Sequence, residues 1–478
     1  MSGVRPAMAH RWEILRPDEV QRLHDATLQL LSEVGVVFHS EQALAVLRAH
    51  GAKVEGETVH FPPQLVEKAL ETVPGEIVLH GRTPARDLVL GQGNIHYTSC
   101  FGPVRVRRIG EKETVAGTLE DLRNFTVLSD AIDNVSYCLF HVRPHEVPAG
   151  LHDVYCAATM LKITDKHVHF SQDTARNTET LISLGEIAAA DAGVAGPVFS
   201  LGCCPNSPLF YTEDACNKLL IAVPKGITFL VVSGAMAGGT SPVTLAGTLL
   251  VQNAEVLAGF TLAQLLRPGA PLIYGSFSGG MDFSSGIFVS GGAELALLQA
   301  ATAQICRFYR VPYGYGTGGW TDAREPGPQA GFEKACTMLS AALAGVEVIH
   351  SAIGGMLGGL DIADYAQMII DDELAGMVNR YVRGIEVSEE TLAYDVIREV
   401  GPTGQFLDST HTARFFRKEH FLPRILERVI GEVEIDSILI RAQERARHIL
   451  NTHKPNHLSQ AASEQIDEIV AQVTGQYA

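Results

Sequence analysis

The 478-residue chain has little positive charge, few aromatic residues and few cysteines. Its 37 Lys and Arg residues are outnumbered by 54 Asp and Glu residues, giving a net charge of −17. A surface of this sign repels phosphate backbones, so we expect no nucleic-acid partner. Eight cysteines are too few for a disulfide framework in a chain of this length. What remains is a globular composition with 46% hydrophobic residues, enough for a large core.

The chain also lacks the patterns that target a protein to a membrane. Its first 19 residues contain no apolar core, so the sequence predicts no secretory signal peptide. The most apolar stretch, residues 219–238, is interrupted by Pro224, Lys225 and Gly226. It falls short of the ~20 consecutive apolar residues that cross a bilayer. We therefore expect a cytoplasmic protein with no membrane contact.

The first part of the chain, residues 1–93, is predicted to form a small α+β extension. Apolar residues recur at helical spacing over residues 18–34, with Pro17 before them and Gly35 after them. A second helix is predicted after Pro62 and Pro63, and residues 76–80 and 87–90 are predicted to form two short strands joined by a turn.

Between residues 94 and 385, short runs of apolar, β-branched or aromatic residues alternate with helix-length segments. The runs begin about 30 to 43 residues apart, and they are Ile95–Ser99, Val135–Phe140, His167–Ser171, Pro197–Leu201, Thr228–Val232, Pro271–Tyr274, Val311–Tyr315 and Val346–His350. Eight strands alternating with helices predict an α/β fold of the (β/α)8 TIM-barrel class. The alternative is an open doubly wound sheet, but the Gly-rich fingerprint of a dinucleotide-binding sheet is missing after the first strand. Residues 386–478 are predicted to form a C-terminal helical region packed on the barrel.

In a TIM barrel the active site lies at the carboxyl ends of the strands. The residues at these positions are rich in aromatic rings and poor in Lys and Arg: Tyr97, Ser99, Cys100, Phe101, Phe140, His141, Ser171, Gln172, Cys203 to Asn206, Ser233, Tyr274 to Phe277, Tyr315 to Trp320, and His350.

Trp320 is one of only two tryptophans and follows two glycines beyond the seventh predicted strand. It is either a plug for the barrel core or a platform for a cation, because Trp offers the best π-face for a quaternary ammonium group. Tyr97, Phe101, Tyr274 and Phe277 are candidates to complete an aromatic cage.

Histidines in two strands have alternative interpretations. His167 and His169 point to the same side of a strand and could share a zinc ion, but no third ligand is evident at a suitable spacing. Two core histidines are the simpler interpretation, and we predict no metal site. His350 ends the eighth strand and is either a structural histidine or a hydrogen-bond donor to a substrate carboxylate.

The chain resembles the trimethylamine methyltransferase (MttB) family of corrinoid-dependent methyltransferases over nearly its whole length. The resemblance is strongest in these segments: residues 96–102, 204–208, 241–248, 253–257, 274–276, 322–324, 329–334 and 387–392. Archaeal trimethylamine enzymes of this family carry pyrrolysine just before a Ser-Asp-Ala-Lys run. The corresponding run here is Thr321-Asp322-Ala323-Arg324, which places Trp320 at the pyrrolysine position.

This departure puts trimethylamine in doubt as a substrate, because pyrrolysine is thought to form an adduct with it. Relatives without pyrrolysine act on quaternary amines such as glycine betaine. The resemblance implies methyl transfer from such an amine to the Co(I) corrinoid of a separate corrinoid protein, with no tightly bound cofactor in this chain. It makes Trp320 the key residue and offers Asp282, Asp322 and Glu333 as carboxylates near the cation.

We also expect a homo-oligomer. Two other functions stay open: a zinc-dependent methyltransferase or hydrolase built on His167 and His169, and a non-catalytic betaine-binding protein.

Overall fold

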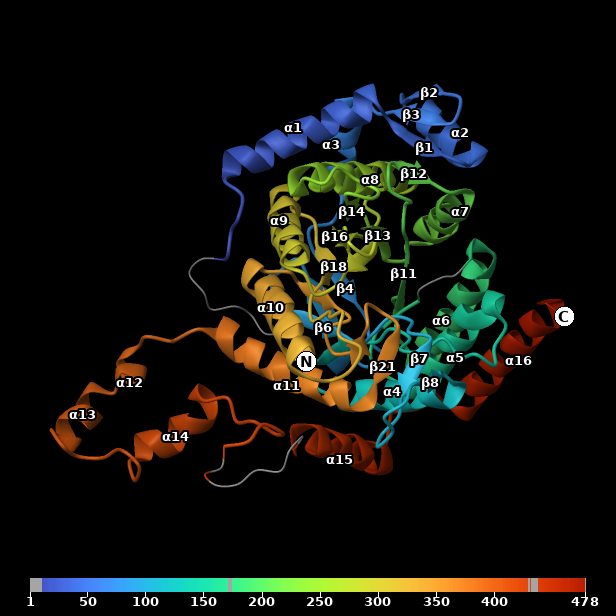
Figure 1. Cartoon of the computed structure of the whole chain (residues 1–478). Helices are drawn as coiled ribbons and strands as arrows, with labels where there is room; N and C mark the ends of the chain where they lie inside the picture. Colours follow the sequence, from blue (N-terminus) through green and yellow to red (C-terminus); the bar gives the residue numbers. More distant parts are fainter. Residues whose placement is uncertain (1–10, 171–173, 429, 431–436, 478) are drawn as a thin grey trace.

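Eight parallel strands form the centre of the molecule in the computed structural model, which describes residues 11–170, 174–428, 430 and 437–477 (Figure 1). The strands are β6 (His96–Thr98), β9 (Val135–Tyr137), β10 (Val168–His169), β11 (Phe199–Cys203), β13 (Phe229–Ser233), β15 (Leu272–Ser276), β18 (Tyr313–Thr317) and β19 (Val348–His350). They pair in the order β10-β11-β13-β15-β18-β19-β6-β9. A parallel bridge between Cys138 and Val168 joins the two ends of this order. The sheet is therefore a closed barrel, and each strand overlaps its predicted run.

A helix follows each barrel strand and packs outside the barrel. These helices are α4 (Leu119–Ala131), α5 (His152–Ile163), α6 (Thr178–Ala192), α7 (Glu213–Ala222), α8 (Leu245–Leu266), α9 (Ala293–Tyr309), α10 (Pro328–Ala344) and α11 (Tyr365–Arg383). Gly345 ends α10 at a φ of +79°, in the left-handed region that glycine adopts most readily. The predicted (β/α)8 barrel is confirmed, and the open doubly wound sheet was wrong.

Helix α8 is mostly apolar around its whole circumference and is largely buried. Among the described residues it alone has the length and composition of a membrane span, and 83% of its most apolar window is buried. The barrel covers one side, and α1 (Pro17–Glu33), α2 (Glu41–Ala49) and α3 (Pro63–Thr72) cover the other. A helix with apolar residues all round is normally buried, and the N-terminal extension buries the side of α8 that faces away from the barrel.

The N-terminal extension also contains a small sheet that the sequence analysis did not predict. Its strands are β1 (Val36–Phe38), β2 (Lys53–Glu55) and β3 (Thr58–His60), and β12 (Phe210–Tyr211) from the loop after β11 pairs with β1. The predicted helices α1 and α3 are present, whereas α2 was missed.

The predicted hairpin, β4 (Ile77–Leu79) and β5 (Leu88–Leu90), closes the amino-terminal end of the barrel. Its alternate apolar residues pack against inward-facing side chains of the barrel strands, including Leu230, Ile273 and Val348. The buried carboxylate of Glu347 accepts hydrogen bonds from the backbone of Gly91 and Gly93 and holds the hairpin in place. The hairpin thus fills the amino-terminal end of the barrel interior, and the carboxyl ends of the strands form the opposite end.

Within the described residues, seven short strands and five further α-helices belong to the loops and the C-terminal region. The loops at the open end carry β7 (Arg105–Arg107), β8 (Val115–Ala116), β14 (Met236–Ala237), β16 (Gly279–Asp282), β17 (Ile287–Val289), β20 (Met356–Leu357) and β21 (Ile362–Asp364). Helix α15 (Ser437–Thr452) packs on α11 and α4, and α16 (Gln460–Tyr477) packs on α5 and α6. In contrast, α12 (Glu389–Leu392), α13 (Tyr394–Val400) and α14 (Thr410–Glu419) extend away from the barrel (Figure 1).

Candidate functional site

Trp320 lies just beyond the carboxyl end of β18, at the open end of the barrel. Its ring is buried in an apolar cluster with Cys100 and Met356, and the partly exposed side chains of Phe277, Phe288 and Leu360 pack around the cluster. The indole Nε1 donates a hydrogen bond to the carbonyl oxygen of His350, 3.0 Å away. Trp320 is only 2% exposed, so a ligand that reaches the ring must displace one of the partly exposed side chains.

A buried ion pair fixes the loop that carries Trp320. Lys334 on α10 donates hydrogen bonds to the carbonyl of Gly319 at 2.8 Å and to Asp371 on α11 at 3.1 Å. Asp371 also accepts a 2.8 Å hydrogen bond from the backbone of Gly355, in the loop after β19. The side chains of Lys334 and Asp371 are 1% and 0% exposed. The pair therefore ties together the two loops on either side of the indole.

Two of the predicted carboxylates bind backbone groups of the loops around Trp320. Glu333 accepts hydrogen bonds from the hydroxyl of Thr321 at 2.5 Å and from the backbone of Asp322 at 2.8 Å. Asp322 accepts from the backbone of Ser290 and Gly291 at 3.0 Å. Hydrogen bonds from Thr321 and Gln329 hold the pKa of Glu333 below its usual value, against the opposing effect of burial. Both residues support the loop structure in the described geometry.

A cleft of about 540 Å³ opens beside these carboxylates, between the loops that follow β15, β18 and β19. Asp282, Asp322 and Glu333 all line it, so the structure brings the three predicted carboxylates together around one opening. Phe288 lines the cleft and also packs against the Trp320 cluster. Phe288 thus lies both at the cleft and against the cluster that holds the indole.

His350 is buried at the end of β19 with one ring nitrogen unpaired. Its Nδ1 lies 3.0 Å from the hydroxyl of Ser351, while its Nε2 has no hydrogen-bond partner among the described residues. Its ring stacks on Tyr315, with centroids 3.3 Å apart. Burial lowers the pKa of His350 far below its usual value, so the imidazole is neutral. When the Ser351 hydroxyl donates to Nδ1, Nε2 carries the proton and is a free donor.

The backbone behind His350 is held in an uncommon conformation. Ser351 has a φ of +57°, in the left-handed region that costs a non-glycine residue about 1 kcal/mol or more. The backbone nitrogen of Ser351 donates a 2.8 Å hydrogen bond to the hydroxyl of Thr98 on β6. This strain lies at the carboxyl end of the barrel, where functional residues are expected.

Phe101 and Phe277 lie at the open end of the barrel, as the sequence predicted. The ring of Phe101 lies 6.4 Å from His350, and that of Phe277 lies 6.4 Å from Tyr315. Together with Trp320 these side chains form one continuous aromatic group at the barrel mouth. Tyr315 had been nominated only as part of a loop segment, and the structure shows it facing into the barrel against His350.

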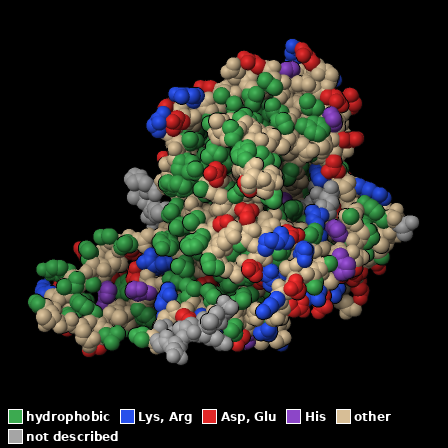
Figure 2. Space-filling view, viewed as in Figure 1, with side chains coloured by type: hydrophobic (Ala, Val, Ile, Leu, Met, Phe, Trp, Pro, Cys, Tyr) green, Lys and Arg blue, Asp and Glu red, His purple; other side chains and the backbone are tan. Residues whose placement is uncertain are grey.

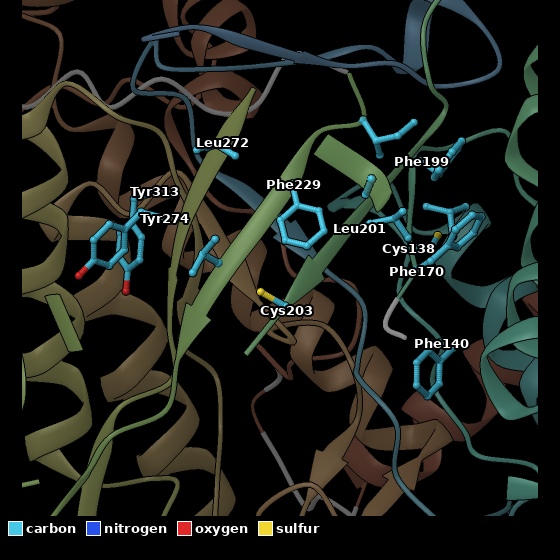
Figure 3. Close-up of a cluster of buried hydrophobic side chains, with 14 of the residues drawn as sticks. Cys138, Phe140, Phe170, Phe199, Leu201, Cys203, Phe229, Leu272, Tyr274 and Tyr313 are labelled. Atoms are coloured by element: carbon cyan, nitrogen blue, oxygen red, sulfur yellow. The ribbon is translucent and has the colours of Figure 1, made fainter. Parts of the chain in front are cut away.

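Tyr97 and Tyr274, by contrast, do not lie at the mouth. Tyr97 points out of the barrel and donates a 2.8 Å hydrogen bond to Asn379 on α11. Tyr274 points toward α8, donates to Asn253 and lies edge-on to Tyr313 (Figure 3). The two tyrosines fill the layer between strands and helices, so the expected cage of four rings around Trp320 loses two of its members.

The sequence of the whole chain matches a family of known proteins. Residues 4–477 match the family described as "Trimethylamine methyltransferase (MTTB)". A glycine betaine methyltransferase of Desulfitobacterium hafniense (strain Y51) is 34% identical, with 97% of each chain covered. A trimethylamine methyltransferase of Methanosarcina barkeri is 36% identical, with 82% of this chain and 80% of the relative covered.

The chain belongs to the trimethylamine methyltransferase family.

Solved structures agree on the fold. The monomethylamine methyltransferase of Methanosarcina barkeri has a TM-score of 0.55 at 13% sequence identity, over 92% of this chain and 88% of that one. At this identity the similarity concerns the barrel fold alone. This member of the trimethylamine methyltransferase family is therefore a methyltransferase built on a (β/α)8 barrel.

His169 of β10 and His167, which directly precedes this strand, make hydrogen bonds inside the barrel of this family member. His167 lies 2.9 Å from the carbonyl of His80 and 3.1 Å from the hydroxyl of Ser200, and His169 lies 3.0 Å from the same hydroxyl. In the part of the chain that the structure describes, no three His, Cys, Asp or Glu side chains gather closely enough to hold a metal ion. Ser171 and Gln172, nominated from the sequence, lie outside the described residues.

The buried cysteines near the mouth of this methyltransferase have raised pKa values. Burial raises the pKa of Cys100 to about 12 and also raises that of Cys203. Because the thiolate is the nucleophilic form, neither of these two thiols is activated as a nucleophile.

Proposed function

We propose that this methyltransferase moves a methyl group from a quaternary amine of the betaine type, such as glycine betaine, to the Co(I) corrinoid of a cognate corrinoid protein in the cytoplasm. The observation that carries the proposal is the position of Trp320. Its indole follows β18 directly at the barrel mouth, next to Phe277 and to the aromatic group around His350. No tightly bound cofactor is assigned to this chain.

The aromatic mouth suits a cation whose charge disappears during the reaction. A desolvated aromatic face binds a quaternary ammonium with about 0.5–2 kcal/mol per ring. When the methyl group leaves, the nitrogen keeps the electron pair of the C–N bond and departs as a neutral tertiary amine. A carboxylate in direct contact would hold the cation more strongly than the transition state and slow the reaction. Rings at the centre and carboxylates at the rim are the better arrangement.

The three carboxylates of the cleft fit this rim position. Hydrogen bonds from Ser284 and Ser285 lower the pKa of Asp282, and those of Thr321 and Gln329 lower the pKa of Glu333, so both remain charged near neutral pH. Negative charge at the entrance raises the local concentration of cations and their rate of entry. We assign these residues to steering rather than to contact with the reacting methyl group.

The unpaired Nε2 of His350 supports a substrate that carries a carboxylate. A buried donor without a partner costs about 1–3 kcal/mol, a cost that an acceptor on the ligand removes. The carboxylate of a betaine is such an acceptor. Neutral His350 would bind it through a hydrogen bond, with no second charge brought into the barrel.

The methyl acceptor in this proposal is a corrinoid carried by a partner protein. When bound over the mouth, it would supply the electron pair for the new bond to the methyl carbon. The residues of this chain bind the amine, aim one methyl group outward and exclude water.

Methyl transfer to free cob(I)alamin tests the proposal directly. Purified protein would be mixed with reduced cobalamin and, in turn, glycine betaine, choline and trimethylamine, and methylcobalamin formation followed by absorbance. We expect turnover with glycine betaine, less with choline and none with trimethylamine. Turnover of trimethylamine alone would contradict the proposal.

The same preparation separates two other functions. Stoichiometric zinc in elemental analysis, with activity lost on chelation, would favour a zinc-dependent methyltransferase or hydrolase. Tight binding of glycine betaine without methyl transfer, even with a corrinoid protein supplied, would indicate a betaine-binding protein.

A further inference from the structure

Residues 385–418 form an arm that leaves the barrel and returns to it. The arm begins after Gly384 at the end of α11 and carries α12, α13 and most of α14 (Figure 1). It returns where Arg380 donates a hydrogen bond of 2.6 Å to the carbonyl of Glu419 and the ring of Phe421 lies against Gly376. Both ends of the arm are therefore anchored on the last two turns of α11.

The arm exposes most of its large apolar side chains. Of its residues only Phe415 is buried. Eight large apolar residues are 38% to 83% exposed: Ile385, Val387, Leu392, Tyr394, Ile397, Phe406, Leu407 and Phe416. Figure 2 shows hydrophobic side chains spread over this part of the surface. Meanwhile Arg414 pairs with Glu390, and Lys418 lies 3.4 Å from Glu386.

An isolated segment of this kind does not hold its conformation in water. Fixing a backbone costs entropy at every residue, and apolar burial is the main term that offsets it. With one buried side chain in residues 385–418, that burial must come from outside the described chain. Exposed apolar surface of this extent is typical of a protein interface.

The arm joins the barrel at the end opposite the mouth. Helix α11 starts beside the loops of the mouth, where Tyr365 donates a hydrogen bond to Asp121. Near its end, Asn379 donates a 3.1 Å hydrogen bond to Asn134, which precedes β9 at the amino-terminal end of the barrel. A corrinoid protein docked over the mouth would contact the other end of the barrel, so we assign the arm to a different partner.

The arm offers the apolar area that a dimer of this chain requires. At ~1.5–3 kcal/mol per side chain and ~25 cal/mol per Å², a large apolar side chain has about 60–120 Å² of apolar surface. Eight such side chains, each exposed by 38% to 83%, therefore contribute about 300–600 Å². In a two-fold dimer the same patch is used twice, giving about 600–1,200 Å² of apolar surface. Because apolar atoms make up somewhat over half of an interface, this area matches the ~1,000 Å² or more in total that a specific interface buries.

We propose that the arm, residues 385–418, is the self-association surface of this protein and that a second copy of the chain covers it in an isologous contact. In such a contact the exposed apolar side chains of the arm would form the core of the interface, and its charged residues the polar rim. The contact brings two barrels together at the ends away from their mouths, which leaves both mouths free.

Sedimentation of the full-length chain tests this interface. The wild-type protein should sediment at twice the chain mass or a multiple of it at micromolar concentration. Replacing Ile385 and Leu407 by Asp should weaken self-association about a hundredfold or more. The matched control is Val34→Asp, a similarly exposed apolar residue at the end of α1, which should leave the mass unchanged.

Two outcomes would overturn the proposal. One is a wild-type chain that is monomeric at every concentration tested. This outcome overturns the proposal even if the monomer binds a different protein through the arm. The other is an arm variant, folded by circular dichroism, that keeps the wild-type mass. Hydrogen exchange gives a second readout, because amides of residues 385–418 should be protected in the wild type and exchange rapidly in the double variant.

Discussion

Replacing Lys334 by Met should destabilise the protein and release the Trp320 loop together. The substitution keeps the length of the side chain but removes the ammonium that binds the carbonyl of Gly319 and the carboxylate of Asp371. Because both partners of this pair are almost completely buried, Asp371 is left as a charge in an apolar interior. Breaking a buried pair in this way costs about 3–5 kcal/mol of unfolding free energy.

The loss of stability in Lys334→Met should grow as the pH rises. Burial raises the pKa of Asp371, and the charge of Lys334 opposes that rise. Without Lys334 the folded-state pKa of Asp371 rises further above the unfolded value of about 3.9. The folded variant then binds a proton more tightly than the unfolded chain, so its stability is retained below about pH 4 and falls as pH increases through the raised pKa. The deficit of Lys334→Met should be larger at pH 8 than at pH 5.

A double variant tests whether the effects of Lys334 and Asp371 on stability are coupled. When Asp371→Leu is added to Lys334→Met, no buried charge remains, although Gly319 and Gly355 lose hydrogen bonds worth about 1–3 kcal/mol each. The double variant should therefore be no less stable than either single variant. A loss equal to the sum of the two single losses would refute the coupling.

Tryptophan fluorescence gives the readout at the site. In a Trp12→Phe background Trp320 is the only tryptophan, so its emission reports the loop directly. We expect a red shift and slower methyl transfer in Lys334→Met at temperatures where it is folded. The matched control is Lys166→Met, since Lys166 is equally buried and binds the carbonyls of Ser129 and Ile132 far from the mouth. Equal effects of the two substitutions on emission and rate would refute a specific role for Lys334.

Three further predictions concern the mouth and the barrel interior. Trp320→Ala should lower the rate of methyl transfer at least tenfold and cost about 3–5 kcal/mol of stability, whereas Trp320→Phe should retain part of both, measured by cobalamin methylation and urea unfolding. His350→Phe should raise KM for glycine betaine and leave KM for choline unchanged, because only the betaine carries a carboxylate; equal changes would remove His350 from substrate binding. Burial lowers the pKa of His167 to about 4 and that of His169 to about 3, so both stay neutral in the fold and gain protons on unfolding below pH ~6.5. As the pH falls below ~6.5, each of these two histidines should lower the free energy of unfolding by about 1.4 kcal/mol per pH unit. A urea unfolding midpoint that is unchanged between pH 7 and pH 5 would contradict this.

The barrel strands could be predicted from the sequence because buried parallel strands are short continuous apolar runs. The direction of each side chain could not, because a run that is apolar on both faces does not reveal its register. In β15, Ile273 packs inside the barrel while its neighbour Tyr274 faces α8. Successive strand residues point to opposite sides, so an aromatic residue in such a strand has two possible positions.

The parts of the site that depend on contacts between distant segments were missed. Lys334 and Asp371 lie on different helices, and neither stands out in the local sequence. The left-handed conformation of Ser351 likewise arises from packing against Thr98 on another strand. Trp320 could be singled out because it is rare and follows two glycines, which is a local signal.

The most direct test of the central claim is whether Trp320 recognises a fixed positive charge. Calorimetry would compare the binding of glycine betaine with that of the anion of tert-butylacetic acid, which has the same shape but carbon in place of the charged nitrogen. The wild type should bind the betaine more tightly by about 0.5–2 kcal/mol, and this difference should shrink in Trp320→Leu. The same preference in both proteins, or none in the wild type, would contradict the assignment of Trp320 as the cation platform.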